Sequence, residues 1–241
     1  FHGLVGLLPS LDPESRRFCY NVDFTVWNNI VGNLDEKYMV GIEARGKAGQ
    51  RIDMYCNSAS GFTQFTNYSK ALQDVVPGAE DGTADGSISS MACGKNTIVV
   101  GSYNTKDHYV IPNVNNETAI LGYEQLKVGD MSYFTSYGTL TDGTTRPHIC
   151  APGALIVSSN NRYYETYPYE IAAATDGTRP YTWVGMQGTS QAAPHVAGAL
   201  TLWLEADPTL TVQECKEIIQ QTAVRDEFVE TGIQAQWGAG K

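Results

Sequence analysis

The sequence predicts an α/β protein with two modules, an antiparallel β-sheet over about residues 1–65 and a parallel-sheet core with helices over about residues 91–241. Three patterns predict this. Apolar and polar residues alternate with period two in the first 60 or so positions, short continuous apolar runs follow after residue 91, and the last third has helical periodicity. Alternation is typical of a sheet with one solvated face, and continuous apolar runs are typical of strands buried on both faces.

In the first module, residues 18–27 alternate most clearly, and residues 38–44 and 52–56 repeat the pattern more weakly. Residues 46–49 (GKAG) are a natural hairpin connection between the last two. We therefore expect at least three antiparallel strands, about half of a sandwich, with the even-numbered side chains from Phe18 to Val26 buried. The opposite face would present Asn21, Asp23 and Thr25.

The domain boundaries follow from this change of pattern. We expect a β-rich module over residues 1–75, a loop of glycine, acidic and small residues over 76–90, and the α/β module over 91–241.

In the second module, residues 96–101 and 154–157 are the expected buried strands. A helix over about residues 190–205 is apolar nearly all round, which predicts deep burial, and we expect Pro194 to lie in its first turn. A second helix follows a capping-box pattern from Thr211 to Glu214. Its apolar face is expected to comprise Val212, Cys215, Ile218 and Ile219.

Composition excludes several classes of function. The chain has 16 basic and 26 acidic residues, a net charge of −10, which disfavours binding to nucleic acid or to anionic membranes. No apolar run approaches the roughly 18 residues that a membrane span requires. The five cysteines are widely scattered without the spacing of a metal site, so we expect buried thiols rather than zinc ligands or a disulfide framework.

The segment that carries chemistry is residues 188–200 (GTSQAAPHVAGAL). A Gly-Thr turn places Ser190 at the start of a helix, where unpaired backbone N–H groups and the helix dipole can stabilise an oxyanion beside its hydroxyl. Ser190 is therefore the candidate nucleophile, and its own N–H is the candidate oxyanion donor. The alternative is that Ser190 only caps the helix.

This segment closely resembles the nucleophile segment of the subtilisin-like serine proteases, the subtilases. Weaker resemblances occur in the order of the family at residues 96–103, 134–138, 148–153 and 237–241. The resemblance implies a partial subtilisin-like core over about residues 91–241. It also implies a serine endopeptidase that acts on polypeptides through an acyl-enzyme at Ser190, and a structural role for His195.

Subtilase chemistry also requires a general base, an Asp that orients it and a second oxyanion donor. The family has Asp and His motifs before the nucleophile, and this chain has neither motif. Two weak candidates remain, His2 as the base and Asn33 as the oxyanion donor. Asp-Gly-Thr or Asp-Gly-Ser occurs in polar loops, out of the family's order, at Asp81, Asp85, Asp142 and Asp176.

The resemblance thus implies that the catalytic Asp and His lie in an upstream segment, that residues 1–65 are an inserted β-sheet, and that this fragment alone is inactive. The expected partners are the polypeptide substrate and the N-terminal half of the same catalytic domain. We expect no cofactor, although calcium is common in the family, and an extracellular or cell-envelope location. Two alternatives stay open, a catalytically dead pseudoprotease and a scaffold that displays the β-sheet module.

Overall fold

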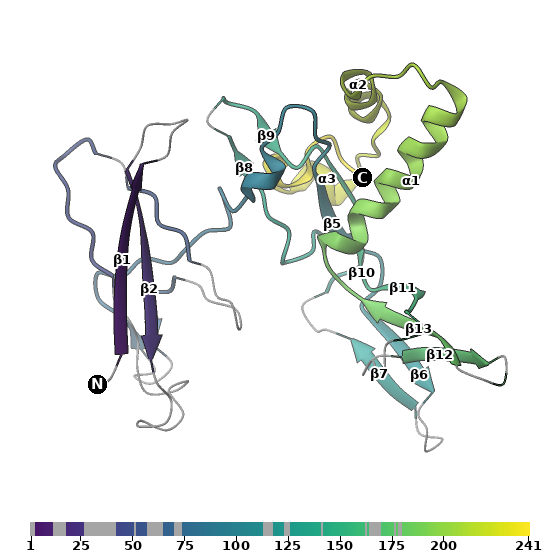
Figure 1. The fold of residues 1–241 in the computed structure, drawn as a ribbon, viewed down its shortest axis with the longest axis horizontal. Coiled ribbons are helices and arrows are strands. Elements are labelled where there is room, and N and C mark those ends of the chain that lie inside the picture. Colours follow the sequence, from purple (N-terminus) through teal and green to yellow (C-terminus); the bar gives the residue numbers. More distant parts are fainter. Residues whose placement is uncertain are drawn as a thin grey trace. The chain divides into compact units, whose positions relative to one another are not determined.

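A computed structural model of the chain contains two compact units, Phe1–Gly82 and Thr83–Lys241, each considered by itself below (Figure 1). The described residues are 3–11, 18–26, 42–50, 52–56, 65–69, 74–112, 118–122, 126–140, 142–161, 163, 170–175, 177 and 180–241. The division between the units falls within the glycine-rich and acidic residues 76–90.

The first unit contains an antiparallel pair, β1 (Gly3–Leu11) and β2 (Phe18–Val26), in continuous register from Gly3 opposite Val26 to Leu11 opposite Phe18. The strand expected from the alternation at 18–26 is therefore confirmed, as is its antiparallel pairing. The expected burial of the even face is wrong at Tyr20, which is 58% exposed. Among the described residues this sheet has only two strands, and a two-stranded sheet buries little surface.

The strands expected over 42–44 and 52–56 are absent from those described residues, while residues 38–41 lie outside the described part of the chain. Ile42, Ile52 and Met54 are exposed there. The turn between them does form, with the Gln50 N–H donating to the Lys47 carbonyl at 3.1 Å. Alternation alone therefore did not produce a strand at these residues. A short pair, β3 (Tyr68–Ser69) and β4 (Asp74–Val75), completes the described elements of this unit.

The second unit is built on a parallel pair, β5 (Val100–Asn104) and β10 (Ile149–Ala154). The expected parallel sheet is confirmed, but both strands are displaced from their expected ranges. The first begins at Val100 rather than at residue 96, and the strand expected over residues 154–157 is interrupted at Leu155 before β11 (Ile156–Ser159). Leu155 is 1% exposed, so burial rather than strand pairing accounts for its apolar character.

Antiparallel strands extend from this core. β12 (Glu170–Thr175) and β11 both pair with the central strand β13 (Pro180–Met186), and β6 (His108–Pro112) pairs with β7 (Thr118–Gly122). A short hairpin joins β8 (Gly138–Thr139) to β9 (Thr145–Arg146), and a 3₁₀ turn, η2, covers Ser90–Ala92. Figure 1 shows α1 continuing directly from the end of β13.

Four helices close the chain. They are α1 (Thr189–Ala206), α2 (Val212–Thr222), α3 (Glu227–Thr231) and α4 (Gln234–Trp237). The capping box of α2 is confirmed, because the Thr211 hydroxyl accepts the Glu214 N–H while the Glu214 carboxylate accepts the Thr211 N–H. On the expected face of α2, Cys215 and Ile219 are buried.

The expectation that α1 is deeply buried is wrong. Its only buried residue is Ala192, while Leu202 is 65% exposed and Leu204 is 42% exposed. Among the described elements, α1 packs chiefly against β10 and β5. Pro194 is the sixth residue of the helix and so lies beyond the first turn, where its missing N–H leaves the Ser190 carbonyl without the usual helical partner.

Two small clusters of buried residues lie in the described part of the second unit. Leu126, Ala154 and Leu155 pack with Tyr109 and Phe134. Cys150, Val229 and Trp237 form the other cluster with Tyr103, Met131 and Phe228. Of the cysteines, Cys150 and Cys215 are buried as expected, but Cys56 and Cys93 are exposed, which corrects the expectation for those two. Within the described ranges, no helix is both long and apolar enough to cross a bilayer.

Candidate active site

Ser190 lies at the junction between β13 and α1, as the second residue of the helix. Its side chain is exposed and makes no hydrogen bond to any described residue. Gly188, which caps the helix, has φ 151° and ψ 161°, a conformation that a residue with a Cβ atom rarely adopts. The backbone thus turns sharply immediately before Ser190 and presents its hydroxyl to solvent.

Backbone hydrogen bonds anchor this turn to the parallel sheet. The Gly188 N–H donates to the Gly153 carbonyl near the end of β10 at 2.8 Å. The Gly188 carbonyl in turn accepts the N–H groups of Gln191 at 3.0 Å and Ala192 at 3.3 Å. The position of Ser190 therefore depends on Gly153, a residue 37 positions earlier in the chain.

Gly153 has no room for a side chain. A Cβ atom there would overlap Ser102 Oγ and lie 2.8 Å from the Gly188 carbonyl oxygen. The close approach of three backbone segments, β5, β10 and the turn before α1, is possible only because residue 153 is glycine.

A buried polar network lies under Gly153. Ser132 Oγ donates to Asn104 Oδ1 at 2.7 Å, so Ser102 must be the donor in its 2.7 Å hydrogen bond with Ser132 Oγ. The Asn104 amide donates to the Lys127 carbonyl at 3.0 Å, and all three side chains are at most 1% exposed. No pattern in the sequence predicted this network. Its one signal was Ser102 and Asn104, two polar residues at alternate positions just after the predicted buried strand at residues 96–101.

Two backbone donors beside Ser190 have no acceptor. The N–H groups of Gly188, Gln191 and Ala192 are all paired, whereas those of Thr189 and Ser190 have no partner within the described ranges. Unpaired N–H groups at a helix N-terminus lie in a positive potential. This arrangement can stabilise a negative oxygen that forms next to the Ser190 hydroxyl.

The described histidines are all engaged away from Ser190. His195 is exposed, and its Nδ1–H donates to the Gln191 carbonyl one turn earlier in α1 at 2.8 Å. The expectation that this side chain lies within a buried helix is therefore wrong. His108 Nδ1 lies 2.7 Å from a carboxylate oxygen of Asp107, and His148 Nδ1 accepts the Val99 N–H at 2.9 Å.

The remaining sequence candidates divide into two groups. His2, Asn33 and Asp176 lie outside the described residues. Asp81, Asp85 and Asp142 are exposed in loops, and Asp142 accepts the hydroxyl and N–H of Thr144, which lowers the pKa of its carboxyl group. The described part of the chain thus brings neither a base nor an orienting carboxylate to Ser190.

Calcium, which the resemblance allows, would need a cluster of oxygen ligands. No group of three or more His, Cys, Asp or Glu side chains among the described residues is placed to hold a metal ion. The described residues therefore do not fit a calcium site of that kind.

Comparison with known proteins identifies relatives of this chain. The model of the subtilase family matches residues 28–240. This match begins earlier than the motifs at about residue 91 and includes part of the predicted β-rich module.

Three curated proteins are similar over shorter stretches. The chain is 38% identical to the minor extracellular protease Vpr of Bacillus subtilis over 38% of its length, and 30% identical to the subtilisin-like protease SBT1.9 of Arabidopsis thaliana over 50%. It is 36% identical to the serine protease AprX of Bacillus subtilis over 36%. The matched stretches cover 10%, 17% and 19% of these three relatives, respectively.

Proposed function

The chain belongs to the subtilase family, and from this premise we propose that it is the nucleophile-bearing part of a serine endopeptidase. The observation that carries the proposal is the exposed Ser190 hydroxyl at the start of α1, beside its own N–H, which no described residue accepts. The protease names of the three relatives support the same reaction class.

In the proposed reaction a base removes the proton of the Ser190 hydroxyl as its oxygen attacks the carbonyl carbon of the scissile peptide. The carbonyl oxygen becomes an oxyanion and accepts a hydrogen bond from the Ser190 N–H. When the tetrahedral intermediate collapses, the base gives its proton to the leaving amine and an acyl-enzyme remains. Water then attacks the acyl-enzyme by the same route and regenerates the Ser190 hydroxyl.

The base and its orienting Asp are proposed to lie in an upstream part of the same catalytic domain. The exposed apolar side of α1 supports this proposal, because a helix that is apolar nearly all round is stable only when it is covered. The β10–β5 pair supports it as well, since a two-stranded parallel sheet normally occurs as part of a larger buried sheet. The upstream part would supply the additional strands and the cover.

We propose further that the β1–β2 unit is an insertion in this catalytic domain and that the protein acts outside the cytoplasm. The antiparallel pair, which differs in kind from the parallel core, supports the first point. The printed name of Vpr, an extracellular protease, supports the second. The reaction as proposed uses only side chains and backbone groups and needs no cofactor.

A fluorophosphonate probe tests the proposal, because it labels a serine only when a base activates the hydroxyl. We expect no labelling of residues 1–241 alone and stoichiometric labelling at Ser190 in a longer chain that carries the upstream segment. Ser190→Ala should abolish turnover of the longer protein, with a loss of about 10⁶ in kcat carried over from the same change in subtilisin itself. Its thermal unfolding should hardly change, because the Ser190 hydroxyl makes no hydrogen bond to a described residue.

The outcomes distinguish the competing functions. Labelling of the longer chain supports the protease, and its absence in a folded longer chain would mean a pseudoprotease or a display scaffold. Labelling of residues 1–241 alone would show that a base lies within this chain, with His2 the first residue to test. Undiminished proteolysis by Ser190→Ala would remove Ser190 from the mechanism.

A further inference from the structure

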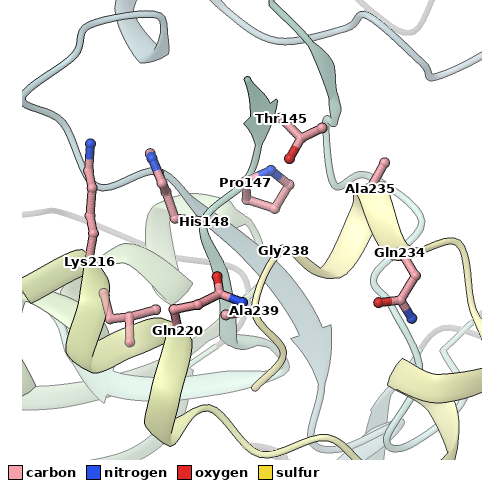
Figure 2. Close-up of a pocket in the computed structure, with 10 residues that line it drawn as sticks. Thr145, Pro147, His148, Lys216, Gln220, Gln234, Ala235, Gly238 and Ala239 are labelled. Carbon is pink, nitrogen blue, oxygen red and sulfur yellow. The ribbon is translucent and has the colours of Figure 1, made fainter. Parts of the chain in front are cut away.

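A pocket of about 370 Å³ lies between the β9–β10 junction and helices α2 and α4 (Figure 2). His148 comes from the β9–β10 junction and Lys216 and Gln220 come from α2, while Gly238 and Ala239 follow α4. Figure 2 shows Lys216 and His148 next to one another on one side of the pocket. Apolar surface is supplied by Pro147, Ile219 and Ala235.

The pocket is separate from the Ser190 site. It begins at His148, just before the first residue of β10, whereas the Ser190 turn is bound at Gly153 near the end of that strand. Five residues at about 3.3 Å each separate His148 from Gly153 by roughly 16 Å along this strand.

The charges around this pocket are positive. Its lining contains Lys216 and His148 but no Asp or Glu, although the chain as a whole has a net charge of −10. Arg146, one position before the lining residue Pro147, is 5% exposed, and its Nε–H is buried without an acceptor among the described residues. Burial, together with the positive charges of Arg146 and Lys216, lowers the pKa of His148 from 6.5 to about 4.

Lys216 and His148 have hydrogen-bond donors that no described residue accepts. His148 Nδ1 accepts the Val99 N–H, so the neutral imidazole carries its proton on Nε2 and can donate it. Lys216 Nζ uses one of its three protons on the Lys95 carbonyl at 2.7 Å. An ammonium and an imidazole N–H beside each other form a site for a small anion, and an apolar floor favours an anion that carries a short hydrocarbon part.

We propose that this pocket binds a carboxylate, which accepts hydrogen bonds from Lys216 and His148 and packs its aliphatic part against Ile219 and Ala235. The carboxylate can belong to a free carboxylic acid or to a Glu side chain of a polypeptide. Its negative charge would also offset the potential of the buried Arg146 guanidinium.

The test is an NMR titration of the His148 imidazole in the full chain, with propionate in one arm and N-acetyl-glutamate amide in the other. Ionic strength is matched with sodium chloride throughout. We expect a saturable shift of the His148 resonances and a rise of the His148 pKa with either ligand, because a bound anion stabilises the imidazolium. Tighter binding of the glutamyl ligand would assign the site to a polypeptide, and equal affinities would assign it to free acids.

Substitutions at Lys216 make the test specific. Lys216→Gln should weaken binding by about tenfold or more, since a charge-assisted hydrogen bond is lost, and Lys216→Arg should retain it. Lys106→Gln removes the same charge from an exposed side chain outside the pocket and is the matched control. The proposal fails if the His148 resonances do not respond to either ligand. It also fails if sodium chloride alone shifts them equally, if the resonances of the exposed His195 shift equally, or if Lys106→Gln weakens binding as much as Lys216→Gln.

Discussion

At the scale of single residues, the placement of Ser190 depends on a glycine in another strand. Gly153 accepts the Gly188 N–H and leaves no space between Ser102 and the Gly188 carbonyl for a side chain. The small size of residue 153 is therefore as important for the candidate site as the residues of the nucleophile segment itself.

We expect Gly153→Ala to destabilise the chain by about 1–3 kcal/mol, the usual cost of overpacking, because the new methyl group would collide with rigid neighbours. Denaturant unfolding measures the change. Gly198→Ala is the matched control: a Cβ atom at residue 198 would meet no neighbour within 4 Å, and the residue lies within α1, so alanine should stabilise the helix by up to about 1 kcal/mol. Equal effects of the two substitutions would contradict the role given to Gly153.

His148 provides a pH-dependent contribution to stability. Burial, Arg146 and Lys216 lower its pKa from 6.5 to about 4, so between these values the unfolded chain binds a proton that the native chain does not. The contribution is complete above pH 6.5, is lost as the pH falls toward 4, and is constant below that. After allowance for solvent screening we expect it to be about 1–2 kcal/mol.

Replacing His148 with asparagine isolates this contribution, because the amide oxygen can still accept the Val99 N–H but cannot be protonated. The difference in unfolding free energy between wild type and His148→Asn should vary between pH 4 and 6.5 and stay level above that range. A difference that is independent of pH would show that His148 titrates normally in the native chain.

At the scale of elements, α2 is specified locally. Its capping box satisfies backbone donors at the start of the helix, and Cys215 and Ile219 supply a buried face. α1 differs, because its N-cap residue, Gly188, has no side chain that could accept a hydrogen bond from the first turn. This helix therefore depends on packing against β10 and β5.

Thr211→Ala should therefore destabilise the chain by about 1 kcal/mol, the typical cost of losing an N-cap hydroxyl. Thermal unfolding followed by circular dichroism measures this loss. Thr211→Ser keeps the hydroxyl and should behave like the wild type, and a loss of the same size in both variants would assign the effect to the methyl group instead.

At the scale of the whole molecule, the exposed apolar side of α1 distinguishes this chain from the longer protein. Leu202 is 65% exposed, so Leu202→Ala should change the stability of residues 1–241 by less than about 0.5 kcal/mol. In a longer chain whose upstream part covers α1, the same substitution should cost about 2–5 kcal/mol.

Leu155→Ala is the control for this comparison. Leu155 is 1% exposed in the second unit, so its truncation should cost about 2–5 kcal/mol in either length of chain. Denaturant unfolding of both variants in both lengths provides the four values. An equally small effect of Leu202→Ala in the longer protein would contradict the proposed cover.

The sequence by itself determined the features that rest on local chemistry. The motif at residues 188–200 predicted the turn, Ser190 and the helix, the Thr211–Glu214 pattern predicted the capping box, and the alternation at 18–26 predicted a strand. Each of these features depends on interactions between residues a few positions apart, or on a sequence motif that the members of a family share.

Only the tertiary structure decided which of the sequence patterns became paired strands or buried surfaces. Residues 52–56 alternate like a strand yet form none, and Tyr20 and Leu202 are apolar yet exposed. Leu155 interrupts the strand expected over residues 154–157 yet lies in the core. The anchoring of Ser190 through Gly153, and the network of Ser102, Ser132 and Asn104 beneath it, join segments tens of residues apart. Burial and hydrogen bonding across such separations depend on what the folded chain brings into contact, and no local pattern contains that information.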